Sequence, residues 1–212
     1  MPVRIGAVDE DATCAGKSIA GAMHPFSEDL TKGCQFFAQL AQTSTQAEEI
    51  RYANTACIFI AASAIEAKVN EWISISQILG GEGKIPEDFW KSLVSLQRNL
   101  RFEDKWNLIA SLHNGKLWDR GQDPFQSFDI IVSLRNELIH YKGQFLGRDE
   151  TPNKKIKDLM RRFGVKSHAT FIEDEVSTWV EDLLKVKELG GWICSKIKSF
   201  CNDAYSLLLG GT

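Results

Sequence analysis

The stretch "QAEEIRYANTACIFIAASAIEAKVNEWISISQI", residues 46–78, decides the fold. Its helical pattern is long, and its second half is apolar on nearly every side. A helix of that kind is normally surrounded by other helices, so this stretch predicts the central helix of a bundle. The sequence "GGEGK" at 80–84 ends it, because adjacent glycines interrupt a helix.

Helical patterns also dominate the chain on either side of the central stretch. Ser27, followed by acidic residues, starts the first helix, and Asp123 caps another helix that has Pro124 in its first turn. Further helices are expected within 85–97, 101–116, 154–166 and 174–209, the last with a kink or break at the glycines 190 and 191. No sustained period-two alternation and no internal repeat occur. The sequence therefore predicts an all-α, up-and-down helical bundle with long central helices, built from one domain over 26–209 and preceded by a flexible lead-in over 1–25.

Composition narrows the classes of protein. The 212 residues are 43% hydrophobic and 25% charged, with a net charge of -3, so nothing global indicates nucleic-acid binding. No signal peptide and no apolar run of membrane-spanning length occur, which predicts a cytoplasmic protein without membrane association. The five cysteines form no CxxC pair and are expected to be reduced thiols, with no metal site and no cofactor.

The stretch "DIIVSLRNELIHYKG", residues 129–143, carries unusual polar residues in a helix that is expected to end at Gly143. On a helical wheel Arg135 lies inside the apolar arc. Asn136 and His140 are four positions apart, so they stack on one ridge beside it. A buried and unpaired arginine costs several kcal/mol, so Arg135 needs either a carboxylate or an anion.

Two interpretations of these residues stay open. The central helix brings Glu66 and Asn70 to one face, and Glu66 could form a buried structural ion pair with Arg135. Alternatively, Arg135 could hold a phosphate while His140 moves protons, which is the chemistry that RNA cleavage by its own 2′-hydroxyl requires. The basic segment 153–166 is interpreted as a solvated helix face, with an RNA-contact surface as the alternative.

The segment "RNELIH", residues 135–140, resembles the R-x4-H motif of HEPN domains, and Asn136 matches the polar residue that commonly follows the arginine. Two other stretches resemble helices of the same family: "IEAKVNEW" at 65–72, and "FEDKWNLI" at 102–109. The resemblance covers roughly 30–205, most of the chain.

The resemblance implies a homodimeric helical bundle in which two R-x4-H motifs form one composite, metal-independent endoribonuclease site. Arg135 and His140 would be catalytic and Asn136 would support them, while Glu66 and Asn70 would position Arg135 or line the cleft. Many members of the family are bacterial toxins or antiviral effectors, so RNA is the expected substrate and an antitoxin or regulatory protein an expected partner. The alternative is a non-catalytic helical module that binds a nucleotide or a protein.

Two further cations follow the motif directly. Lys142 and Arg148 lie just past His140 in the sequence, in the polar stretch that separates this helix from the basic segment. If the cleft exists, these two side chains are the expected RNA contacts, because positive charge beside the motif would attract phosphates.

Overall fold

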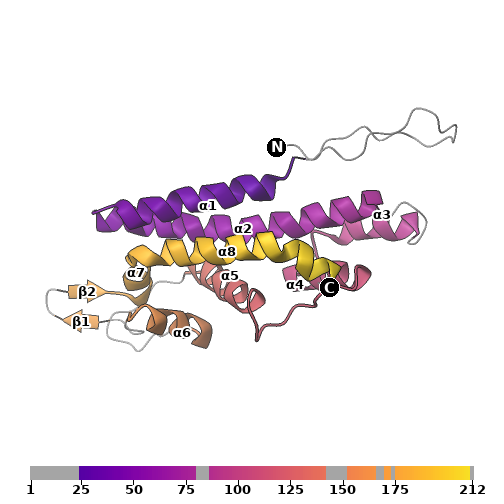
Figure 1. Ribbon diagram of the computed structural model, residues 1–212. Helices are drawn as coiled ribbons and strands as arrows, with labels where there is room; N and C mark the ends of the chain where they lie inside the picture. Colours follow the sequence, from indigo (N-terminus) through magenta and orange to yellow (C-terminus); the bar gives the residue numbers. More distant parts are fainter. Residues whose placement is uncertain (1–23, 80–85, 142–151, 166–169, 173–174, 211–212) are drawn as a thin grey trace.

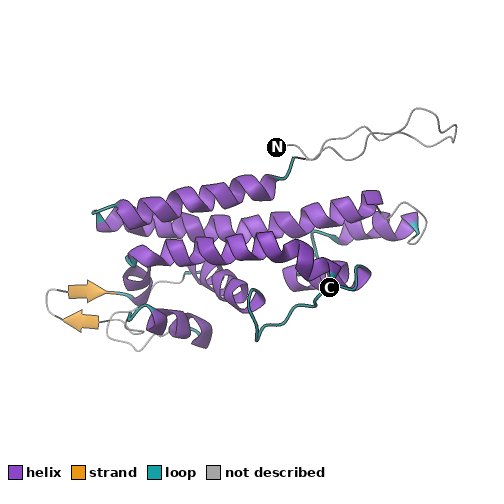
Figure 2. Ribbon diagram, in the orientation of Figure 1, coloured by secondary structure: helices purple, strands orange, loops and turns teal. Residues whose placement is uncertain are grey.

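The computed structural model describes residues 24–79, 86–141, 152–165, 170–172 and 175–210. Figures 1 and 2 show helices packed together, with one small hairpin at the edge. The elements in chain order are α1 (Phe26–Thr43), α2 (Ala47–Leu79), α3 (Glu87–Leu96), α4 (Phe102–Leu112), α5 (Phe125–Ile139), α6 (Lys154–Arg162), β1 (Thr170–Ile172), β2 (Glu175–Ser177), α7 (Trp179–Leu184) and α8 (Lys187–Leu209).

The three longest helices, α1, α2 and α8, run side by side, and each packs against the other two (Figure 1). Small residues let their backbones approach closely. A Cβ atom added to Gly190 of α8 would lie 2.9 Å from Asn54 Oδ1 and 3.1 Å from the Cα of Ala38. Those distances are shorter than van der Waals contact, so only glycine fits where α8 crosses α1 and α2.

The shorter helices α4, α5 and α6 lie beneath these three helices in Figure 1. Aromatic side chains join α4 and α5 to α8. The Trp106 ring centroid lies 4.9 Å from that of Phe200 and 5.5 Å from that of Phe125, and all three side chains are fully buried. Such rings bury large apolar areas, so this cluster fixes the position of α5 against the long helices.

The predicted all-α bundle is confirmed. The central helix spans Ala47–Leu79, within one residue of the expected bounds at each end. The hairpin was not predicted: β1 pairs antiparallel with β2, with Phe171 opposite Val176. Its strands have three residues each, too few for a period-two pattern to be recognised.

A kink or break was predicted at the glycines 190 and 191, and the break is wrong, because α8 runs continuously through both. The interruption lies earlier, at residues 185 and 186, between α7 and α8. There the buried amide of Asn54 donates hydrogen bonds of 2.8 Å to the carbonyl oxygens of Leu184 and Val186. Asn54 thereby gives a partner to the carbonyl group of Leu184 at the end of α7, and it adds a second donor to that of Val186, which also accepts from the backbone N–H of Leu189.

Two other expectations concern the N-terminal lead-in and the absence of membrane association. Of the lead-in expected over 1–25, residues 1–23 lie outside the described residues. Among the helices of the described residues, none is long and apolar enough to cross a membrane.

Candidate functional site

The candidate site lies at the C-terminal end of α5. Phe128, Ile131 and Leu134 bury one face of this helix in the core. At its other end, Asp123 accepts a 2.6 Å hydrogen bond from Lys196 of α8 and a 3.2 Å bond from the backbone N–H of Ser127. The core contacts and the bonds of Asp123 therefore fix the position of α5 against the rest of the bundle.

The side chain of Arg135 is half-buried and faces no carboxylate of the described residues. One guanidinium N–H group donates to Oδ1 of the exposed Asn136 over 3.0 Å. Within the described residues, the guanidinium makes no ion pair and no second hydrogen bond. An arginine has five N–H donors, so most of this group's hydrogen-bonding capacity is left for a ligand.

His140 does not belong to the helix, contrary to the expectation that the helix continues to Gly143. The last helical residue is Ile139, and His140 is the C-cap, with its backbone N–H donating to the carbonyl oxygen of Asn136 over 3.0 Å. The imidazole is exposed. A histidine in this place can exchange protons with a bound molecule, since no core residue covers it.

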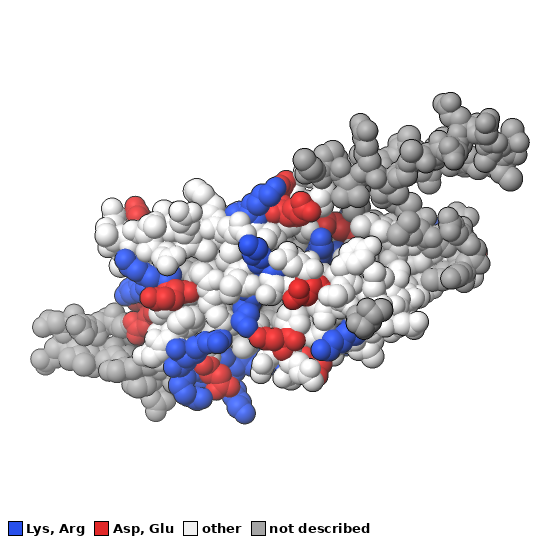
Figure 3. All heavy atoms as spheres, viewed as in Figure 1, with Lys and Arg blue, Asp and Glu red and all other residues white. Residues whose placement is uncertain are grey.

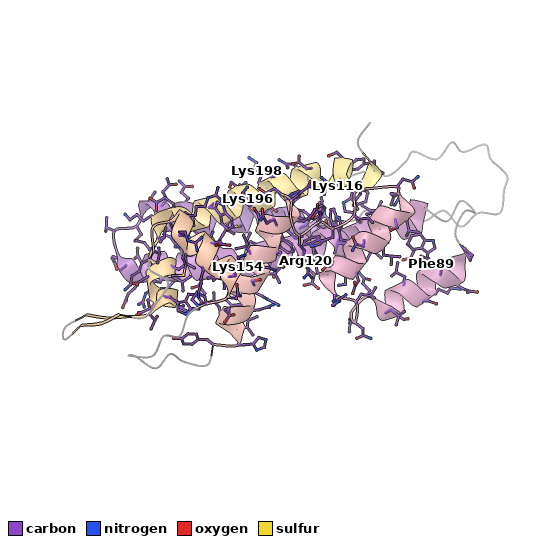
Figure 4. All side chains as sticks on the ribbon, turned by 90° about the horizontal axis from the view of Figure 1, so that it is seen from below. Phe89, Lys116, Arg120, Lys154, Lys196 and Lys198 are labelled. Atoms are coloured by element: carbon purple, nitrogen blue, oxygen red, sulfur yellow. The ribbon has the colours of Figure 1, made fainter. Side chains whose placement is uncertain are left out.

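Helix α6 begins beside this end of α5. Nδ2 of Asn153, the N-cap of α6, donates to Glu137 Oε1 over 3.4 Å, and Lys155 pairs with Asp129. Lys and Arg side chains gather over α6 on the face shown in Figure 3, and Figure 4 labels Lys154 close to α5. The basic surface is therefore adjacent to the helix that carries the arginine and the histidine.

Glu66 and Asn70 lie in a different environment from Arg135. Glu66 Oε1 lies 3.3 Å from Nζ of Lys105, and Asn70 Oδ1 accepts hydrogen bonds from Lys105 Nζ at 3.3 Å and from Gln97 Nε2 at 2.8 Å. The ion pair between Glu66 and Arg135 that the sequence suggested is absent from the described residues. The cation that Glu66 and Asn70 contact is Lys105 of α4.

Sequence reasoning missed Lys105, although the signal was present. Phe102, Lys105, Trp106 and Ile109 recur at the spacing of one helix face, and the other three are large and apolar. A lysine at such a position is unusual, and the structure buries it almost completely, with 3% of its surface exposed. A buried ammonium needs polar partners, which α2 provides.

Lys142 and Arg148, the expected RNA contacts, lie outside the described residues. No group of three or more histidine, cysteine, aspartate or glutamate side chains in the described residues has an arrangement that could hold a metal ion. No protein-family model matches the chain, and neither a curated protein nor a solved structure matches it. The fold and the arrangement of its side chains therefore define the class: a helical bundle with a half-buried arginine and an exposed histidine near one helix end.

Proposed function

We propose that the protein is a metal-independent endoribonuclease of the HEPN type, acting as a homodimer. The observation that supports this most is that the guanidinium group of Arg135 keeps most of its hydrogen-bond donors free. Its guanidinium makes no ion pair with any described residue and contacts the exposed Asn136, and the exposed His140 follows five residues later as the C-cap of the same helix. A cation with free donors next to a proton-transfer group is what phosphodiester cleavage requires.

The reaction proceeds by attack of the RNA's own 2′-oxygen on the adjacent phosphorus. The bond from phosphorus to the 5′-oxygen breaks, which leaves a 2′,3′-cyclic phosphate and a 5′-hydroxyl. His140 takes the proton from the 2′-hydroxyl or gives one to the leaving 5′-oxygen. Arg135 binds the non-bridging phosphate oxygens and stabilises the charge that builds up on them. Asn136, which accepts from Arg135, orients the guanidinium.

A homodimer supplies both proton transfers, because one protomer's His140 acts as the base while the other's acts as the acid. Two large apolar side chains flank His140 in the sequence, and both are exposed: Ile139 by 47% and Tyr141 by 48%. Apolar side chains at a polar site favour a protein contact there. They support a dimer in which the ends of the two α5 helices meet.

The competing interpretation, a non-catalytic module in which Glu66 neutralises Arg135, loses its main argument. Glu66 pairs with Lys105, so Arg135 has no structural carboxylate partner among the described residues. This leaves Arg135 available for an external anion such as a phosphate.

The experiment that tests the proposal compares RNA with fully 2′-O-methylated RNA of the same sequence, with the protein in EDTA. Cleavage of RNA alone, with 2′,3′-cyclic phosphate ends, is the expected result. Cleavage of both substrates, or products that carry 5′-phosphates, would overturn the proposal, because neither arises from attack by the 2′-oxygen.

A further inference from the structure

A pocket of about 670 Å³ lies between α2, the end of α3 and α4. Its lining is polar and comes from Glu66, Asn70, Ser95, Gln97, Arg98 and Lys105. No residue of α5 contributes to the lining, so this pocket is distinct from the Arg135 and His140 site. We propose that the pocket binds a small molecule through a phosphate group, held by Lys105 and Arg98.

The charge of the lining favours an anion. Arg98 and Lys105 bring two positive charges and Glu66 brings one negative charge, so the pocket carries a net charge of +1. Arg98 is exposed, and it makes no ion pair or hydrogen bond with any described residue. Its guanidinium is free to bind two phosphate oxygens at once.

The second cation is held in place before any ligand arrives. Lys105 is almost fully buried, and its ammonium group donates to Glu66 and Asn70 over 3.3 Å each. Both bonds are long for contacts of a charged donor, and a third N–H group remains. A phosphate oxygen would therefore give the buried ammonium group of Lys105 a third acceptor, in addition to its two long hydrogen bonds within the protein.

Asn70 is oriented for the same ligand. Its Oδ1 atom accepts one hydrogen bond from the ammonium group of Lys105 and one from the side-chain amide of Gln97. This fixes the amide with its oxygen toward the lysine, so the Nδ2 group points elsewhere and has no partner among the described residues. Because Asn70 lines the same pocket, this group can donate to another part of the bound ligand.

Glu66 acts as the competitor of the ligand. Its side chain is 52% exposed while that of Lys105 is 4% exposed, so the carboxylate can turn to water at low cost and the ammonium cannot. Glu66 Oε1 lies 3.3 Å from Lys105 Nζ, so its negative charge would oppose a phosphate that binds the third N–H group of Lys105. Replacing the carboxylate by an amide would remove this competition and keep an acceptor for Lys105.

The test is a titration of inorganic phosphate into the whole protein at fixed ionic strength, followed by the ³¹P line width. Wild type should broaden the signal. Arg98→Gln should weaken binding about tenfold, the value of one charge-assisted contact. Glu66→Gln should strengthen it about fivefold by removing a like charge. Arg101→Gln is the matched control, because Arg101 is exposed and pairs with Asp104.

Competition identifies the form of the phosphate. Displacement of inorganic phosphate by ribose 5-phosphate, but not by ribose, indicates a phosphate ester, and failure of both to displace it indicates the free ion. Displacement by ribose would overturn the proposal, as would absent broadening, or equal binding by wild type, Arg98→Gln and Glu66→Gln.

A double variant separates this pocket from the proposed ribonuclease site. Arg135→Ala combined with His140→Ala should keep phosphate binding and lose RNA cleavage. Loss of phosphate binding in that variant would place the anion at the end of α5 and overturn the assignment to the pocket.

Discussion

Lys105 and Glu66 form an ion pair of 3.3 Å in which 4% of the lysine side chain and 52% of the glutamate side chain are exposed. The two partners should therefore respond differently to removal. Glu66→Ala leaves a buried ammonium without its carboxylate and should lower the free energy of unfolding by about 2 kcal/mol. Lys105→Met leaves a carboxylate that water can solvate and should cost less than about 1 kcal/mol. Urea unfolding of both variants measures the difference, and an equal or reversed order would contradict the asymmetric pair.

The two glycines of α8 should also differ. Gly190→Ala forces a methyl group against Asn54 and Ala38 and should destabilise the protein by about 1–3 kcal/mol. Gly191→Ala meets nothing within 4 Å and should stabilise the helix by about 0.5–1 kcal/mol, because alanine loses less backbone entropy. Thermal melts of the two variants provide matched measurements. Equal effects would mean that α8 does not pack closely on α1 and α2.

The Cys194 thiol should be reactive near neutral pH. A hydrogen bond from Cys34, together with the charge of Lys198, lowers the pKa of Cys194 to about 7, although burial opposes this. Alkylation of the Cys194 peptide by iodoacetamide, followed by mass spectrometry, should reach half its maximal rate near that pH. In Cys34→Ala the midpoint should move up toward the ordinary thiol value. A wild-type midpoint near 9 would contradict the hydrogen bond.

The same pKa has a consequence for stability. The folded-state pKa of Cys194 lies below the ordinary thiol value of 9.0, so the unfolded chain binds more protons between pH 7 and 9. Stability from this group should therefore be present above pH 9 and be lost as the pH falls through 7. Cys34 acts in the opposite direction above pH 9, because its pKa is raised by its cysteine neighbours and by burial. Urea unfolding of wild type and Cys194→Ala across pH 6.5–8.5 measures the slope; the wild type should gain stability with pH relative to the variant, and parallel curves would contradict the shift.

Removal of Arg135 should leave the fold nearly intact. Its described hydrogen bond goes to an exposed neighbour, Asn136, and it forms no ion pair with a residue that the structure describes, so Arg135→Ala should change the free energy of unfolding by less than about 1 kcal/mol. A loss of several kcal/mol would show that the guanidinium has a structural partner. It would favour the non-catalytic interpretation.

Much of the fold could be predicted from the helical periodicity of apolar residues. Where a prediction was wrong, tertiary packing explains why. The apolar second half of α2 identified the central helix because no exposed helix tolerates such a surface. The glycines 190 and 191 indicated a break because glycine is a poor helix former, yet close packing on α1 requires Gly190 inside the helix. Tertiary packing overrode local propensity there.

The candidate site was predictable only in part. The wheel placed Asn136 and His140 on one ridge, but it could not show that the helix ends at Ile139 and leaves His140 as its cap. It also showed which face of α2 carries Glu66 without showing which helix lies opposite. Lys105 of α4 fills that place. Partners between helices depend on how the helices cross, which the sequence of one helix does not contain.

The most direct test of the central claim is RNA cleavage in EDTA by wild type, His140→Ala and the control His24→Ala. His24 is exposed and pairs with Asp29, far along the chain from α5. Wild type and His24→Ala should cleave equally, and His140→Ala should be at least about 100-fold slower, the usual contribution of a general acid or base. Equal cleavage by all three proteins, or none by wild type, would contradict the assignment of a ribonuclease site to the end of α5.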